Sequence, residues 1–296
     1  MAMIETDPVK MVEKMRAKQQ AKLKSKTNVV APSLDPNKPY QMPMWPNQVR
    51  SLPNAFARGA LFTVGNHRAP RRQFKKEPIA SVGNIDVLFT GEELRQDDED
   101  VFLQSLHLAR EKPVLQSEPT VEFTAGAMIR ALGWAHNKRS YERLKTSLER
   151  MQHASVEIKI ANKRGFLGSM IRKAFWEEED GTPSRRWKIY FEPEIVKLFG
   201  PDDYSRLMWE LRLSLTPMEK WLHSFYATHE KPFAYSVVTL HRLCGAASSE
   251  IRGFRRTLKS ALTTLVEKGF LRDYQIDTGD LVHVTRNNVV TDARFA

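Results

Sequence analysis

The sequence predicts an α+β protein, mainly helical, in which one order of elements occurs twice. The stretch from Ser248 to Arg286 combines a basic amphipathic helix with a two-stranded hairpin, after a short helix and a turn. A short helix, a turn, a basic helix and a hairpin also occur between Thr124 and Glu192. This is the order of a winged helix, a helix-turn-helix followed by a β-wing, so we expect two tandem winged-helix domains. The predicted divisions are 1–50 for a flexible basic N-terminal arm, 51–205 for the first domain, and 206–296 for the second domain with a short C-terminal tail.

The charge balance favours a polyanionic partner. The chain has 46 Lys and Arg against 35 Asp and Glu, a net charge of +11, and an isoelectric point near 9.7. Such a surplus suits nucleic acid, which is the first partner that we expect. A membrane surface would also attract this charge. However, no stretch approaches the roughly 18 consecutive apolar residues of a spanning helix, and no lipidation motif stands at either end.

The compartment is predicted from the N-terminus and the cysteine content. The N-terminus has no apolar signal core, and Cys244 is the single cysteine of the chain. An internal disulfide is therefore impossible, which favours a cytoplasmic protein. Because Cys244 lies in the apolar segment VVTLHRLCG, we expect it to pack as a small hydrophobic residue.

The predicted arm, residues 1–50, has few large apolar groups. It carries nine Lys and Arg against four Asp and Glu, followed by several prolines. This composition predicts a flexible segment that is transiently helical between Pro8 and Lys26. Such an arm either adds nonspecific DNA affinity or is a solvated tail, and the composition fits both.

The first predicted domain begins with a strand over 81–90 and a helix over 97–110. The acidic first turn of this helix suits the positive end of the helix dipole. A short strand is predicted over 121–123, and Thr124 is predicted to cap the short helix that follows. A second helix is predicted to begin at Ser140.

This second helix has an apolar side and a basic side. The apolar side contains Tyr141, Leu144, Leu148 and Met151, and basic residues such as Arg150 cover the rest. A hairpin is predicted next, with SVEIKIA and FLGSMIRKAFW as strands and NKRG as the turn, before a further strand SRRWKIYFE behind the polar turn EEEDGTPS. The candidate DNA-binding residues of this domain are Lys138, Arg139, Arg143, Lys145, Lys163 and Arg164.

The second predicted domain starts with the strongest helix signal of the chain. Thr216 is a good N-cap, Pro217 suits the first helical position, and Glu219 completes a capping box. The segment PFAYSVVTLHRLCG is predicted to supply a short helix, and GAASS the turn. The residues predicted to point from the first helix into a core are Met218, Trp221, Leu222 and Phe225.

The predicted recognition helix runs from Ser249 to Lys268. Gly269 is predicted to end it in a left-handed conformation, before a hairpin with the turn DTGD. Its apolar stripe contains Ile251, Phe254, Leu258, Ala261, Leu262, Leu265 and Val266. Its candidate DNA-binding residues are Arg252, Arg255, Arg256 and Lys259. For an isolated segment a solvated cationic face is the commoner case, so the repeated order of elements carries the DNA-binding interpretation.

Several long segments resemble one known family. These segments are WPNQVRSLPNAFARGALFTVGN, FTGEELRQDDEDVF, LGWAHNKRSYERLKTSLERMQ, EIVKLFGPDDYSRLMWELRLSLTPMEKWLHSFYATHEKPF and LHRLCGAASSEIRGFRR followed by DLVHV. They stand in the right order from about Trp45 to Thr285, and with them the chain resembles the TrfA family of plasmid replication initiators.

The resemblance implies a function beyond DNA binding. It implies two winged helices that bind tandem repeats (iterons) at a plasmid origin in the bacterial cytoplasm and help to open adjacent AT-rich DNA, with contacts to its single strands. It also implies recruitment of host replication proteins such as the DnaB helicase and DnaA, and self-association to a dimer that limits copy number. The family's N-terminal segment can carry a sliding-clamp-binding peptide before the Trp-Pro. This chain has NKPYQMPMWP there. Pro43 lies where such a peptide needs a free backbone, so we do not expect clamp binding through this segment.

Two rival classes of function, an enzyme and a transcriptional regulator, would fit parts of this sequence. The sequence has no His-hydrophobic-His pair and no P-loop, and the acidic run EEED lies in a polar turn, so we expect no enzymatic activity, metal or cofactor. A winged-helix transcriptional regulator that binds operator DNA needs the same phosphate and groove contacts as an initiator. The residues alone leave these two open, although two fused DNA-binding domains favour the recognition of direct repeats.

Overall fold

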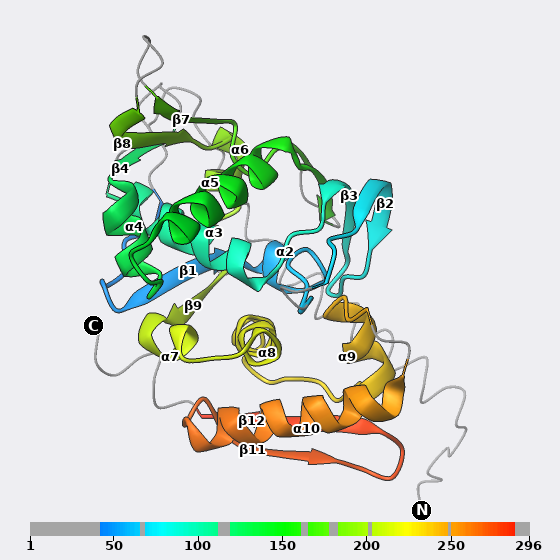
Figure 1. Cartoon of the computed structure of the whole chain (residues 1–296). Helices are drawn as coiled ribbons and strands as arrows, with labels where there is room; N and C mark the ends of the chain where they lie inside the picture. The colour runs from blue at the N-terminus through cyan, green and yellow to red at the C-terminus, as the bar shows by residue number, and fades with distance from the viewer. Residues whose placement is uncertain are drawn as a thin grey trace, which may run out of the picture. The chain divides into compact units, whose positions relative to one another are not determined.

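The computed structural model describes residues 42–65, 69–111, 119–160, 165–177, 183–200, 203–247 and 250–287. Helices and four antiparallel sheets alternate along these residues (Figure 1), which confirms the α+β class. Most of the predicted arm, residues 1–41, lies outside the described residues. In the part of the chain that is described, no helix combines the length and the apolar character needed to traverse a bilayer.

The elements follow one another in this order. The first half contains β1 (Val49–Pro53), α2 (Asn54–Ala57), β2 (Gln73–Ile79), β3 (Ile85–Glu92), α3 (Gln96–Ala109), β4 (Thr120–Phe123), α4 (Ala125–Ala131), α5 (Lys138–His153), β5 (Ser155–Ile160), β6 (Phe166–Gly168), β7 (Lys173–Glu177) and β8 (Pro183–Tyr190). The second half contains α6 (Pro193–Lys197), β9 (Tyr204–Met208), α7 (Trp209–Leu213), α8 (Pro217–Ala227), β10 (Tyr235–Ser236), α9 (Val237–Leu243), α10 (Ile251–Glu267), β11 (Leu271–Ile276) and β12 (Leu281–Arg286).

Two groups of elements share one topology. In the second half, α8, β10, α9, α10, β11 and β12 follow one another, and the sheet order is β10-β12-β11. In the first half, α3, β4, α4, α5, β7 and β8 follow the same pattern, and the sheet order is β4-β8-β7. The strand before the helix pair therefore joins the last strand of the hairpin in both groups. The β5–β6 hairpin is an insertion between α5 and β7, and it belongs to the separate sheet β2-β3-β5-β6.

The segment FLGSMIRKAFW does not form one strand, so this part of the hairpin prediction is wrong. Phe166 to Gly168 pair with β5, but Lys173 to Glu177 pair with β8 in another sheet. Met170 and Ile171 lie between these strands and are fully buried, which interrupts the alternation of a strand. The chain crosses from one sheet to the other between β6 and β7, and the two buried apolar side chains lie at this crossing.

The helix starts are set by capping side chains. The side chain of Thr124 accepts a hydrogen bond from the backbone N–H of Ala127 at 3.2 Å, as predicted. The predicted capping box is also present, since the N–H of Thr216 donates to Glu219 Oε2 at 2.8 Å. The predicted start of α5 at Ser140 is wrong. Asn137 caps this helix by accepting from the N–H of Ser140 at 3.0 Å, so α5 begins two residues before Ser140, at Lys138.

The end of α10 confirms the predicted left-handed glycine. Gly269 has φ +75°, and the N–H of Phe270 donates to the carbonyl oxygen of Leu265 at 3.0 Å. The predicted apolar stripe of this helix is buried at Phe254, Leu258 and three further positions. Ile251 and Val266 are half-buried against the same core. Cys244 is buried in this core as a free thiol, as predicted.

The buried apolar side chains form two clusters. One contains residues from Met42 to Trp209, and the other contains residues from Leu215 to Val284. Trp45 belongs to the first cluster, where it stacks on Phe199 and donates through Nε1 to Nδ1 of His107 at 3.0 Å. Residues 42–50, which the sequence analysis assigned to the arm, are therefore packed into the fold. The predicted division at 205 falls inside β9, which pairs with β1.

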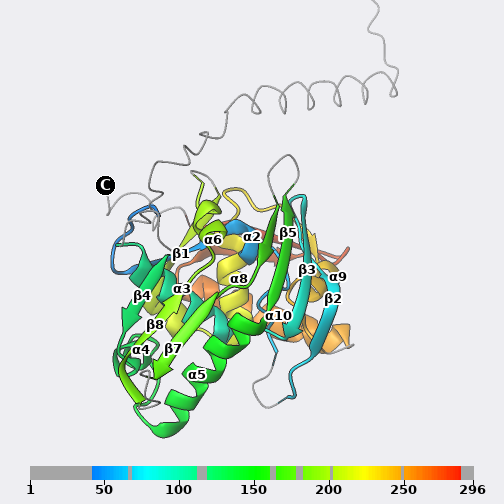
Figure 2. The same cartoon turned by 90° about the horizontal axis from the view of Figure 1, so that it is seen from above.

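The four longest helices connect the two clusters. Helix α3 packs against α5 and α8, and α8 packs against α10 (Figures 1 and 2). Figure 1 shows these helices one below another in the order α5, α3, α8, α10. The two basic helices are thus linked through the contact between α3 and α8.

Candidate nucleic-acid interface

The cationic face of α10 lies opposite its buried stripe. The side chains of Arg252, Arg255, Arg256 and Lys259 are all exposed. Arg255 forms an ion pair with Asp280 in the turn between β11 and β12. In the described part of the chain, the other three cations form no ion pair, so their charge is available to phosphates.

The hairpin β11–β12 is fixed to α10 by one tyrosine. The hydroxyl group of Tyr274 lies 2.7 Å from Oγ1 of Thr263 and donates to the carbonyl oxygen of Lys259 at 3.3 Å. The predicted turn of the hairpin is organised by Asp277, which accepts hydrogen bonds from the N–H groups of Gly279 and Leu281, both at 2.9 Å. A hydrogen bond from His283 and these backbone bonds lower the pKa of Asp277. Helix and hairpin therefore form one preorganised surface.

The predicted DNA-binding residues of α5 fall into two groups. Lys138 and Arg139 are exposed at the first turn of the helix. Arg143 lies over the ring of Trp134 at 3.9 Å, and Lys145 lies over the ring of Trp176 at 4.9 Å. These two cations are held by protein contacts and keep only part of their surface for another partner. Lys163 and Arg164 lie outside the described residues.

The hairpin β7–β8 carries cations that the sequence analysis did not select. In the shared topology it takes the place of β11–β12, next to the basic helix of its own group. Lys173, Arg185 and Arg186 are exposed on it, and the guanidinium of Arg186 lies 3.9 Å from Glu122. The pair of arginines after the turn EEEDGTPS was the available signal. The sequence pattern instead predicts a hairpin over the preceding strands, so these cations are not selected by it.

The comparisons with known proteins identify the family. The family model described as TrfA protein matches residues 6–286. The chain belongs to the TrfA family. The plasmid replication initiator protein TrfA of Escherichia coli is 30% identical over 250 residues, and the match covers 83% of this chain and 64% of that protein. The chain thus spans less than two-thirds of the length of this relative.

Solved structures with a similar fold come from RctB. A crystal structure of domains 2 and 3 of RctB has a TM-score of 0.51 and 13% sequence identity, and covers 80% of this chain and 99% of that chain. A second crystal structure of RctB domains 2–3 has a TM-score of 0.49, covers 77% of this chain and is also 13% identical. At this level of identity the first structure establishes a likeness of fold.

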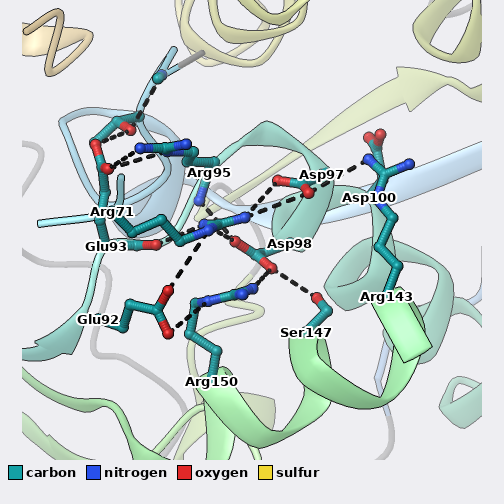
Figure 3. Close-up of polar contacts among 12 residues, drawn as sticks. Arg71, Glu92, Glu93, Arg95, Asp97, Asp98, Asp100, Arg143, Ser147 and Arg150 are labelled. Atoms are coloured by element: carbon teal, nitrogen blue, oxygen red, sulfur yellow. Dashed lines mark hydrogen bonds and ion pairs between the residues drawn. The ribbon is translucent and has the colours of Figure 1, made fainter. Parts of the chain in front are cut away.

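In this TrfA-family chain, the acidic first turn of α3 holds the inner side of α5 (Figure 3). Asp98 is fully buried, and its carboxylate lies 2.7 Å from Arg71 and 2.5 Å from Arg150. It also accepts a hydrogen bond from the hydroxyl group of Ser147 at 2.7 Å. Arg150, predicted on the basic surface of α5, is therefore an internal ion-pair residue and not a candidate for DNA contact.

The neighbouring carboxylate, Asp97, faces the edge of α5. It lies 3.2 Å from Arg71 and 3.3 Å from Arg143. Burial raises the pKa of Asp97, but the charges of Arg71 and Arg143 outweigh this effect, and the pKa lies below its ordinary value. The pKa of Asp98 is raised by burial and by the charge of Asp97. The acidic run predicted to interact with the helix dipole mainly forms ion pairs with other elements.

Proposed function

We propose that this chain is a plasmid replication initiator that binds direct repeats (iterons) at a plasmid origin as two tandem winged helices. Helices α5 and α10 are the two recognition helices, and β7–β8 and β11–β12 are the two wings. The observation that carries the proposal is the exposed cationic face of α10 beside a fixed hairpin, in a topology that the first half repeats around the basic helix α5. The family membership supports the role at an origin.

The residues divide into two expected roles. Arg252 and Arg256 lie on the exposed side of the N-terminal half of α10, where a recognition helix contacts base edges. Lys138 and Arg139 take the corresponding place at the start of α5. The exposed cations of the β7–β8 wing contact phosphates, and these contacts position the protein without specifying sequence. These cations are Lys173, Arg185 and Arg186.

The proposed mechanism uses binding free energy alone. Extra phosphate contacts to deformed DNA offset the cost of bending or unwinding, and this cost is smallest at flexible AT-rich steps. The chain then acts without enzymatic activity: it opens AT-rich DNA, recruits host proteins such as the DnaB helicase and DnaA, and self-associates to limit copy number. These steps are the ones that the resemblance to the TrfA family implies.

The proposal is tested by binding and replication assays with the same DNA. Full-length protein is titrated, at physiological salt, against a labelled origin repeat and against a scrambled duplex of equal length. We expect the repeat to bind about 10³-fold or more tightly than the scrambled duplex. Equal affinity for both duplexes contradicts the proposal. Tight repeat binding without maintenance of a plasmid that carries the gene and the repeats supports a transcriptional regulator instead.

A further inference from the structure

The start of α3 carries four consecutive carboxylates, Asp97 to Asp100, that contact two different sets of neighbours. Successive residues of a helix differ in direction by about 100°, so four adjacent side chains cannot face one partner. Asp97 and Asp98 contact Arg143 and Arg150 of α5. The next two, Glu99 and Asp100, contact residues of α7 and α8. These four consecutive residues of α3 therefore form ion pairs with elements of both groups that share the repeated topology.

Arg212 of α7 is the centre of the second contact. Its side chain is fully buried, and its Nε lies 2.7 Å from Asp100 Oδ1. One terminal nitrogen lies 3.3 Å from Glu99 Oε2, and the other donates to the hydroxyl group of Ser224 at 2.8 Å. Burial alone would lower the pKa of Arg212, but Glu99 and Asp100 raise it above its ordinary value, so the guanidinium stays charged.

The partners of Arg212 are also bonded to one another. Asp100 Oδ2 lies 2.5 Å from Nζ of Lys220, and the hydroxyl group of Ser224 donates to Glu99 Oε1 at 2.7 Å. The links of this cluster thus join α3, α7 and α8 to one another. The planar guanidinium accepts only a narrow range of partner positions, so the cluster fixes an orientation. Buried ion pairs contribute little net stability compared with apolar packing, and their better-supported effect is on the uniqueness of an arrangement.

A second set of contacts, away from Arg212, joins α8 to the segment that follows α2. The indole N–H of Trp221 in α8 donates to the carbonyl oxygen of Gly59 at 3.2 Å. The guanidinium of Arg58 donates to the carbonyl oxygen of Thr228 at 2.8 Å. Because α8 is held at two separate places, it cannot rotate about either contact alone. Because α8 packs against α10, and α3 packs against α5, the position of α8 on α3 determines where the two basic helices lie relative to each other.

We propose that Arg212 is a positioning residue for two-site DNA recognition: by fixing α8 on α3, it sets the distance and the rotational phase between α5 and α10, and so the spacing between the two half-sites that the chain accepts. This inference rests on the proposed function, because it requires that both helices bind one duplex. Arg212 contacts no DNA in this arrangement, since its side chain is fully buried.

The test measures affinity as a function of half-site spacing. Footprinting of the unaltered chain defines the two half-sites, and duplexes are made with the original spacing, with about two inserted base pairs, and with about five, roughly half a helical turn. Each half-site is also tested alone. The variants are Arg212→Met, the milder Asp100→Asn, and Arg212→Lys, which keeps the charge but loses the planar fork. The matched control is Arg206→Met, at an exposed arginine of β9.

The unaltered chain and the Arg206→Met control should bind the original spacing far more tightly than either insertion. For Arg212→Met and Asp100→Asn, we expect this preference to fall by at least about 5-fold, the lower end of typical coupling between sites. Affinity for each isolated half-site should stay unchanged, and Arg212→Lys should be intermediate. A merely structural role lowers affinity for half-sites and for all spacings alike.

The outcomes separate this inference from the proposed function. If the variants fold and keep the narrow spacing preference of the unaltered chain, Arg212 does not set the spacing and the inference is wrong, while the proposed function stands. If the variants lose half-site binding together with full-site binding, the inference is also wrong, because Arg212 then acts on folding. If the unaltered chain has no preference for the repeat, the proposed function fails first.

Discussion

Asp98 of α3 and Arg150 of α5 form an ion pair with 2.5 Å between Oδ1 and Nη1, although 52 residues separate them in the sequence. The side chain of Asp98 is 0% exposed and that of Arg150 is 8% exposed. Removal of Arg150 would leave the buried carboxylate of Asp98 with Arg71 as its remaining cationic partner. This pair therefore matters for the stability of the candidate DNA-binding helix and not for the DNA contact itself.

We expect Arg150→Met to lower the free energy of unfolding by up to about 3 kcal/mol, the lower end of the cost of breaking a buried ion pair from one side, because Arg71 still compensates the charge of Asp98. The control is Arg139→Met, at an exposed position of the same helix, which should change stability by less than about 0.5 kcal/mol. Urea denaturation of both variants measures the difference. Equal stabilities would show that the pair contributes nothing.

The two arginines also show what the sequence can and cannot determine. The capping side chains Thr124 and Thr216 act on groups within three residues, so local pattern was sufficient to predict them. Arg139 and Arg150 are chemically identical on one basic helix, and only the tertiary position of Asp98 assigns Arg150 to the interior. Hydrophobic periodicity determines which side of a helix is buried, but it does not name the partner of a charge.

The same limit explains why the cations of β7–β8 were not predicted as candidates. The alternation over SVEIKIA predicted a strand correctly, and its partner Phe166 to Gly168 as well. No local sequence pattern shows that the chain then leaves this sheet at Met170 and Ile171. Strand order is a property of long-range pairing, so Arg185 and Arg186 could be connected with α5 only after β7 and β8 were placed beside β4.

The arginines Arg255 and Arg256 of α10 should differ in their contribution to repeat binding. Arg255 is paired with Asp280, whereas Arg256 is exposed and has no ion-pair partner among the described residues. We expect Arg256→Ala to cost about 1–3 kcal/mol on the cognate repeat, with weaker discrimination at one base pair. Arg255→Ala should cost less than about 1 kcal/mol, because its charge is already partly neutralised.

Fluorescence anisotropy with the repeat and with single-base variants of it measures both effects, and Arg206→Ala on β9 is the control. A weakening that is equal for all sequences, with a salt slope lower by about one, would assign the residue to a phosphate. If neither substitution changes repeat affinity, α10 is not the recognition helix, and its cationic face only interacts with solvent.

The buried histidines should make the fold sensitive to acid. Burial lowers the pKa of His107 and of His223 to about 3, and nearby arginine charges, such as Arg50 for His107, add to this effect. Below a pH of about 6.5 the unfolded chain binds protons that the folded chain does not bind. The free energy of unfolding should therefore fall as the pH falls from about 6.5 toward 3, by up to about 1.4 kcal/mol per pH unit for each histidine.

The variant His107→Gln isolates one of these contributions, since a glutamine amide oxygen can still accept the hydrogen bond from Trp45. Urea denaturation of both proteins at about pH 7.5 and about pH 5 gives, for each protein, the slope of the free energy of unfolding against pH. The slope of the variant should be smaller, by an amount that approaches the contribution of one histidine. Identical slopes would mean that His107 takes up a proton in the folded chain.

The stacking of α5, α3, α8 and α10 leads to a prediction for the footprint on DNA. Packed helices lie about 8–10 Å apart, so three successive contacts separate the axes of α5 and α10 by at most about 30 Å. Adjacent major grooves on one face of a duplex are about 34–36 Å apart, which the outward-pointing cations of the two helices can span. We therefore expect hydroxyl-radical protection over roughly two helical turns, with both protected segments on one face of the duplex.

Lys138→Ala together with Arg139→Ala should weaken only the protection of the segment bound by α5. Arg252→Ala together with Arg256→Ala should weaken only the protection of the other segment. Protection confined to a single turn would show that the chain uses one of the helices, and the geometry proposed for two half-sites would then be wrong.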